Sequence, residues 1–68
     1  MSNDLIRQEL REYLISHGVM QIYVCDKCSI NPTTLNQFIL GKRNIGYKKL
    51  LTLHQYLIDN GVIFRANL

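Results

Sequence analysis

The stretch from residue 21 to residue 41 constrains the fold of this chain more than any other part of it. Asn31-Pro32 marks the start of a helix, because asparagine is a strong N-cap and proline suits the first helical position. Gly41 marks the end of that helix, since glycine readily adopts the left-handed conformation found there. A shorter helical pattern precedes it at residues 21–28. The sequence therefore predicts two short helices joined by a tight turn.

Helical periodicity divides the residues of this stretch into inner and outer positions. The first helix has one apolar edge, formed by Val24, Cys25 and Cys28. The second helix carries on one face Thr34, Leu35 and Phe38. Its other side carries Thr33, Asn36, Gln37 and Leu40. Two short helices packed through such inner faces form a helix-turn-helix.

The same stretch resembles the helix-turn-helix of lambda-repressor-like and Cro-like phage regulators, whose usual pattern is Q-x-x-L-A-x-x-x-G-[VI]-x-x-x-T-[IL]-x-x-[FIL]-x-x-G. The residues that match it are Gln21, Val24, Ile30, Thr34, Leu35, Phe38 and Gly41. The resemblance covers roughly residues 5 to 58, and it departs from the pattern at Cys25, Ser29 and Leu40. It implies a lambda-repressor-like domain that regulates transcription.

Two longer helical patterns flank the central stretch. Ser2 begins the first as a capping residue, and the stripe expected to be buried is Ile6, Leu10, Tyr13 and Leu14. Arg7 falls among the residues expected to face solvent. The second pattern starts after Gly46, a weak cap, and stops at Asp59-Asn60-Gly61. Its inward face is predicted to hold Tyr47, Leu50, Leu53, His54 and Leu57.

The chain as a whole is predicted to be one all-α domain over residues 1–68, with about four helices and a short C-terminal tail at 61–68. Val62-Ile63-Phe64 is β-prone, so we expect a tail strand that pairs with a partner or folds back on the first helix. A chain of 68 residues buries a modest core, which favours dimerisation or another partner. A homodimer is therefore one expected assembly.

Composition and motifs exclude several classes of function. No apolar run approaches the ~18 residues of a membrane span, and no signal-peptide pattern opens the chain, so we expect no membrane partner and a cytoplasmic location. That cytoplasm would be the bacterial host's if the chain is of phage origin. We find no phosphate loop, nucleophile motif or paired carboxylates. The sequence thus predicts a non-enzyme with no cofactor and no small-molecule substrate.

The two cysteines are three residues apart within one helical pattern. Their inner positions predict two small buried thiols, Cys25 and Cys28. A zinc site would need a second pair of ligands, and His17 and His54 are the remaining histidines. We therefore predict no metal site.

Operator DNA is the first partner that the sequence suggests. The second helix of the motif would enter the major groove and present Pro32, Thr33, Asn36 and Gln37 to base edges. Lys42 and Arg43 would contact phosphates just beyond it. The resemblance implies that Gln21 braces the phosphate backbone. The net charge of +3 suits such a partner but is common in domains that bind no nucleic acid.

A partner repressor protein is the second possibility, because no Lys or Arg occurs between Ser29 and Gly41. The outer surface there instead carries apolar residues, which more often meet protein than phosphate. The candidate interface is Ile22, Tyr23, Asn36, Ile39 and Leu40. The chain is also similar in size and layout to small phage antirepressors, which bind a repressor and block its DNA-reading surface. Both partners remain open from the sequence.

Overall fold

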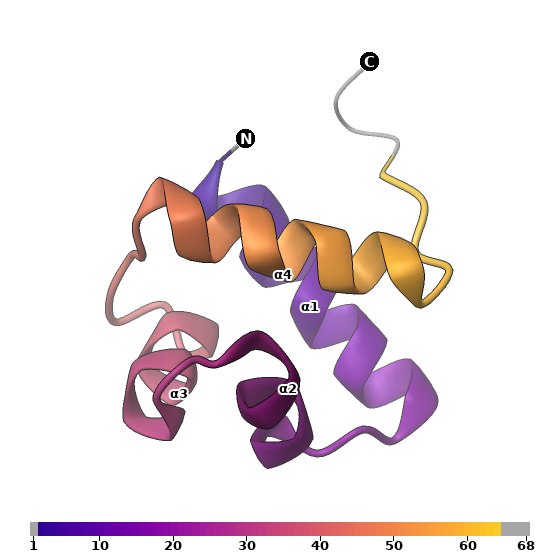
Figure 1. Ribbon diagram of the computed structural model, residues 1–68, viewed down its shortest axis with the longest axis horizontal. Helices are drawn as coiled ribbons and strands as arrows, with labels where there is room; N and C mark the ends of the chain where they lie inside the picture. The colour runs from indigo at the N-terminus through magenta and orange to yellow at the C-terminus, as the bar shows by residue number, and fades with distance from the viewer. Residues whose placement is uncertain (1, 65–68) are drawn as a thin grey trace.

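The computed structural model describes residues 2–64 and consists of four α-helices over that range (Figure 1). They are α1 (Asn3–His17), α2 (Gln21–Cys28), α3 (Pro32–Ile39) and α4 (Tyr47–Asp59). The all-α prediction with four helices is confirmed. None of these helices combines the length and the apolar character needed to cross a membrane.

A tail strand that folds back on the first helix is wrong for the described part of the tail, whereas a strand that pairs with a partner stays a prediction. Residues 62–64 form no strand, and the N–H of Val62 donates to the carbonyl of Leu57 at the end of α4. The tail instead packs through side chains, with the Phe64 ring 4.5 Å from the ring of His54. The rest of the predicted tail, residues 65–68, lies outside the described residues.

The helix ends follow from local capping chemistry. The Ser2 hydroxyl accepts a hydrogen bond from the N–H of Leu5 at the start of α1. Asn31 caps α3 twice, since its Oδ1 accepts from the N–H groups of Thr33 at 2.8 Å and Thr34 at 3.3 Å. Gly41 follows α3 with a φ of 80°, as its predicted role as helix terminator requires.

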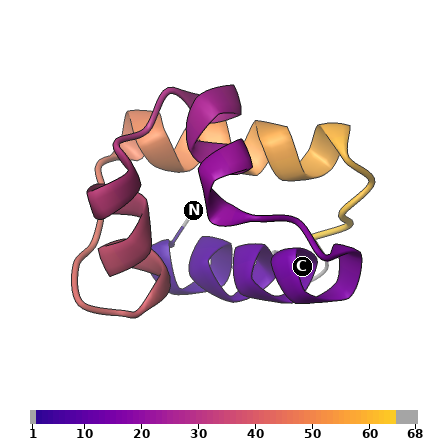
Figure 2. The same ribbon diagram turned by 90° about the horizontal axis from the view of Figure 1, so that it is seen from below.

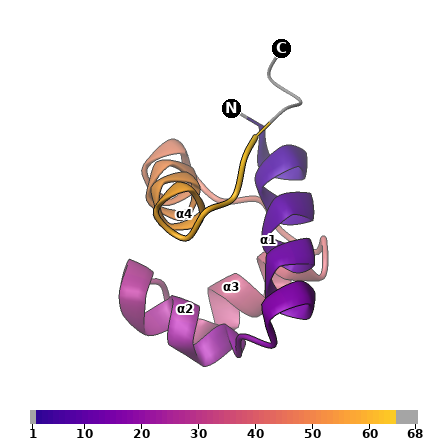
Figure 3. The same ribbon diagram turned by 90° about the vertical axis from the view of Figure 1, so that its right-hand side faces the viewer.

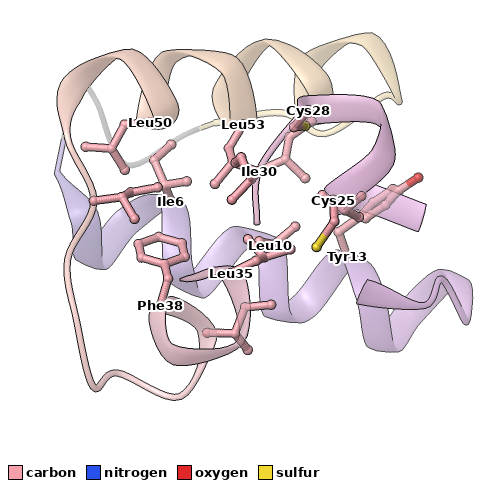
Figure 4. Close-up of a cluster of buried hydrophobic side chains, with 14 residues drawn as sticks. Ile6, Leu10, Tyr13, Cys25, Cys28, Ile30, Leu35, Phe38, Leu50 and Leu53 are labelled. Atoms are coloured by element: carbon pink, nitrogen blue, oxygen red, sulfur yellow. The ribbon is translucent and has the colours of Figure 1, made fainter. Parts of the chain in front are cut away.

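The four helices enclose one apolar core. Helix α1 packs on α4 and α3, and α2 packs on α3 and α4, so every helix contributes to the same interior. Figure 4 shows Phe38 of α3 beside Ile6 of α1 and Leu50 of α4. The largest fully buried side chains are Phe38, Ile6, Leu10, Leu35, Leu53, Leu57 and Val24. Because the core draws on all four helices, the short α2 and α3 are held in place by α1 and α4.

The arrangement leaves α2 and α3 together at one side of the molecule. Figure 3 shows α4 nearly end-on, with α1 to its right and with α2 and α3 below it. Seen from below, α2 lies across the space between α1 and α4 (Figure 2). The outer surfaces of α2 and α3 therefore remain open to a partner.

Two predictions about the burial of apolar residues are wrong. Tyr47 is exposed although it was expected on the inward face of α4, and Ile45 of the preceding loop is buried instead. Tyr47 is the first residue of α4, and helical periodicity alone does not tell whether the core reaches as far as the first turn of a helix. Ile39 was expected on the outer surface but is buried in the core cluster together with Phe38, because α3 packs against both α1 and α2.

Candidate functional site

The site is built on the turn between α2 and α3. Ser29 ends α2 in the left-handed conformation, with a φ of 55°, and among the described residues it is the one non-glycine with positive φ. Ile30 then turns inward and is buried. Its N–H donates to the carbonyl of Cys25, which closes the end of α2. The turn is thus fixed by one strained residue and one buried residue, and it sets the orientation of α3.

The outer surface of α3 is polar and is linked to the start of α2. Pro32, Thr33 and Asn36 are exposed, and Gln37 is half-buried. The Asn36 Nδ2 group donates to Oε1 of Gln21 at 3.3 Å. Two of the predicted DNA-binding residues, far apart in sequence, are therefore neighbours on one surface.

The basic loop after α3 adjoins the same surface. Lys42 and Arg43 are exposed, as predicted. The Arg43 Nη1 group lies 3.4 Å from Oε1 of Gln37, which is at the long end of a hydrogen bond. Such a weak contact places the guanidinium beside the amide, and both groups can still form hydrogen bonds with a partner. We name the surface formed by Gln21, Pro32, Thr33, Asn36, Gln37, Lys42 and Arg43 the polar face.

Arg7 of α1 holds the loop that carries these cations, a role the sequence analysis missed. Its side chain is 12% exposed, not solvated as expected. The guanidinium donates to the carbonyl of Phe38, to the carbonyl of Arg43 at 3.1 Å and to Oδ1 of Asn44 at 2.9 Å. It also lies over the Phe38 ring, 4.7 Å from the centroid, and pairs with Asp4 at 2.7 Å.

Asn3 makes a second link from α1 to the same loop. Its Oδ1 accepts a hydrogen bond from the N–H of Ile45 at 2.8 Å. Asn3, Arg7 and Leu10 follow the i, i+4, i+7 spacing of a single helix stripe. That spacing was the available signal that Arg7 faces the fold and not the solvent.

The predicted apolar interface is split by the structure. Ile22 and Leu40 are 51% and 56% exposed. Tyr23 is also exposed, but it lines a groove between α2 and α4, with the Lys27 ammonium 5.4 Å from its ring centroid. Ile39 is in the core, as described above. Of the predicted set, only Ile22, Leu40 and Asn36 remain as an exposed surface on the outer side of α2 and α3.

The cysteines are buried and free, as predicted. Burial raises the pKa of both thiols; the charge of Asp26 adds to the rise at Cys25, and the neighbouring Cys25 adds to it at Cys28. His17 stacks on the Tyr13 ring with centroids 4.6 Å apart. Within residues 2–64, no three His, Cys, Asp or Glu side chains gather as a metal site would require. The chemistry that the polar face offers is therefore hydrogen bonding and positive charge.

Comparison with known proteins adds no relative. The chain matches no protein-family model, and it gives no match to curated proteins or to solved structures. What the chain does is therefore inferred from the polar face and the surfaces around it.

Proposed function

We propose that this chain is a non-enzymatic transcription regulator of the phage genetic-switch type, a lambda-repressor-like helix-turn-helix domain that binds operator DNA through α3. The supporting observation is the polar face itself. It joins amide side chains suited to base edges with cations suited to phosphate on one exposed surface. Amides and cations in that order, along a helix and just past its end, match what a major-groove reader needs.

The amides supply the sequence preference. The side-chain amide of Asn or Gln can pair bidentately with adenine, because its NH2 group donates to N7 and its oxygen accepts from the N6 amino group. To do so, Gln37 exchanges its 3.4 Å contact with Arg43 for contacts with the base. Asn36 exchanges its bond to Gln21 in the same way. Both internal contacts lie at the weak end of the hydrogen-bond range, so their loss costs little.

The cations supply affinity that is independent of sequence. Two phosphates neutralised by Lys42 and Arg43 give a slope of about −1.8 in log affinity against log salt. Between 50 and 200 mM salt the affinity is then expected to fall roughly tenfold from these two contacts. Gln21, on the first turn of α2, adds a neutral contact to the backbone that does not depend on salt.

The test is selection from a random duplex library with the full chain, followed by binding measurements on the enriched sequence. Gln37→Ala should weaken the enriched duplex by about 1–3 kcal/mol and relax the preference at one base pair. Gln8→Ala, an exposed glutamine on α1, is the matched control. No enriched sequence, or equal losses for both variants, would contradict base readout.

A second binding experiment tests the phosphate role. Arg43→Ala should weaken all duplexes alike and make the salt slope shallower by about one. Arg11→Ala removes the same charge from an exposed position on α1 and should leave the slope unchanged. If both variants change the slope equally, the cations act through net charge and not through the polar face.

The second candidate function is binding to a partner repressor, favoured by the exposure of Ile22 and Leu40 beside a face with no cation on α3. Leu40→Asn separates the two functions. In a DNA complex the leucine can offer no hydrogen bond to the backbone, so the change should leave DNA affinity equal or higher. In a protein complex its loss from a desolvated contact should cost roughly 2 kcal/mol.

Titration of a purified phage repressor against wild type and Leu40→Asn gives the measurement. Ile15→Asn, at an exposed isoleucine on α1, is the control. Loss of repressor binding by Leu40→Asn, with DNA binding intact, would replace operator binding as the main function. Equal repressor affinity for all three proteins removes the protein-binding candidate.

A further inference from the structure

Helix α4 carries its charges against its own dipole. Lys48 and Lys49 lie in the first turn, which has no acidic residue, and Asp59 is the last residue of a helix with no basic residue in its final turn. A helix N-terminus carries partial positive charge and its C-terminus partial negative charge, so both ends of α4 repel their own side chains. Gly46 adds no side-chain cap that would offset this.

The same helix exposes an apolar stripe. Tyr47, Leu51 and Ile58 are 66%, 44% and 43% exposed, although they are large and apolar. At about 100° per residue they fall within roughly 40° of one another around the helix. Helices of single domains normally keep that side polar, so the stripe marks a surface that has no partner within the described fold.

Polar residues form a second stripe directly beside the apolar one. They line the α4 side of the groove between α2 and α4, which has a volume of about 840 Å³, and they are Lys48, Thr52, Gln55 and Asp59. The cation stands at the start of this stripe and the carboxylate at its end. The surface is therefore self-complementary in charge when two copies of α4 meet in opposite directions.

We propose that the apolar stripe of α4 packs against the same stripe of a second copy of this chain, with the two helices antiparallel about a two-fold axis. In that arrangement Lys48 of each copy lies near Asp59 of the other. The N-terminus of each α4 also lies beside the C-terminus of the other copy's α4. The two helix dipoles therefore attract each other, and each charged side chain faces a helix end of opposite sign. A two-fold contact forms each ion pair twice, and it buries Leu51 of both copies near the axis.

The size of the surface predicts a weak dimer. A helix of 13 residues is about 20 Å long. Such a contact covers at most about a tenth of the 4598 Å² surface of each copy, which is less in total than the ~1,200 Å² of stable complexes. We therefore expect a weak dimer whose population rises with protein concentration, and not an obligate dimer. The stripe contains no residue of the polar face, so this inference does not depend on DNA binding.

Sedimentation equilibrium of the full chain from about 10 μM to 1 mM tests the proposal. The expected result is a mass that rises from 7.9 kDa toward twice that value over this range. Leu51→Gln should remove the rise, whereas Ile15→Gln, at an exposed apolar position on α1, should retain it. A monomer at every concentration, or equal behaviour of the two variants, would overturn the proposal.

Charge reversal gives a sharper test with a control on the same turn. Lys48→Glu should raise the melting temperature, because the new charge suits the helix dipole, and should weaken the dimer about tenfold by facing Asp59. Lys49→Glu makes the same change of charge on the opposite side of the helix and should raise the melting temperature only. Lys48→Glu combined with Asp59→Lys should restore the wild-type dimer. Equal weakening by both lysine variants, or no restoration, would refute the antiparallel pairing.

Discussion

Replacing Arg7 with methionine removes the guanidinium but keeps most of the apolar stem of the side chain. Three acceptors then lose a hydrogen bond: the carbonyls of Phe38 and Arg43, and Oδ1 of Asn44. The last two are exposed and gain water in exchange. The Phe38 carbonyl is partly buried and still accepts from the N–H of Gly41, but the bond it loses is to a charged donor, which makes this the costly loss.

The expected cost follows from these contacts. The lost hydrogen bond from a charged donor costs about 1.5–3 kcal/mol. The lost cation–π contact with Phe38 adds about 0.5–2 kcal/mol. The pair with Asp4 adds little, because that carboxylate is 96% exposed. We expect a total of about 2–4 kcal/mol, which lowers the melting temperature by roughly 8–30 °C in a domain of this size.

Thermal and urea denaturation followed by circular dichroism measures this loss. Arg11→Met, which changes an exposed arginine one turn later on α1, is the matched control and should cost less than about 0.5 kcal/mol. Hydrogen exchange adds a local measurement, since the Ile45 amide bonded to Asn3 should exchange faster once Arg7 no longer holds the loop. Equal stability of the two methionine variants, with unchanged exchange at Ile45, would refute the role assigned to Arg7.

Other predictions concern the turn, the cap and the thiols. Ser29→Gly should stabilise the fold by about 1 kcal/mol, because glycine adopts the left-handed conformation without strain, whereas Ser16→Gly within α1 should destabilise it by about as much. Asn31→Ala should cost about 1–2 kcal/mol in denaturation experiments, since two amides lose their cap. Burial raises the pKa of the Cys25 and Cys28 thiols above their usual 9.0 in the fold, so the unfolded thiols ionise first. The free energy of unfolding should therefore be highest below pH 9 and fall as the pH rises through the folded pKa. This fall should be smaller in a variant in which Cys25 and Cys28 are both replaced by alanine.

The helices near the candidate site could be predicted because their boundaries depend on neighbouring residues. Asn31-Pro32 starts α3 and Gly41 follows its end whatever the rest of the chain does. Periodicity then separated the buried Phe38 from the exposed Asn36 correctly. Burial of Ile39 could not be predicted in the same way, because it depends on α1 packing against α3, which no local pattern records.

Contacts between distant segments were the part that the sequence did not reveal. Arg7 and Phe38 are 31 residues apart, and a charged side chain is by default assigned to solvent. Its burial depends on acceptors at the end of α3 and in the following loop, the carbonyls of Phe38 and Arg43, which come within its reach only when α1 packs against α3. The loop after α3 depends on α1 as well. Its residue Ile45 is buried, and the N–H of Ile45 donates to the side chain of Asn3 on α1.

This dependence links the stability of the fold to the geometry of the polar face. Arg7 bonds both the Phe38 carbonyl at the end of α3 and the Arg43 carbonyl, so α1 fixes where the basic loop leaves the helix. The side chain of Arg43, in turn, lies beside the amide of Gln37. If α3 binds operator DNA as proposed, a change at Arg7 should shift the phosphate-binding cations relative to the base-reading amides, although Arg7 itself is too buried to meet DNA. Its effect on DNA affinity should largely disappear in an Arg43→Ala background, whereas its effect on stability should remain.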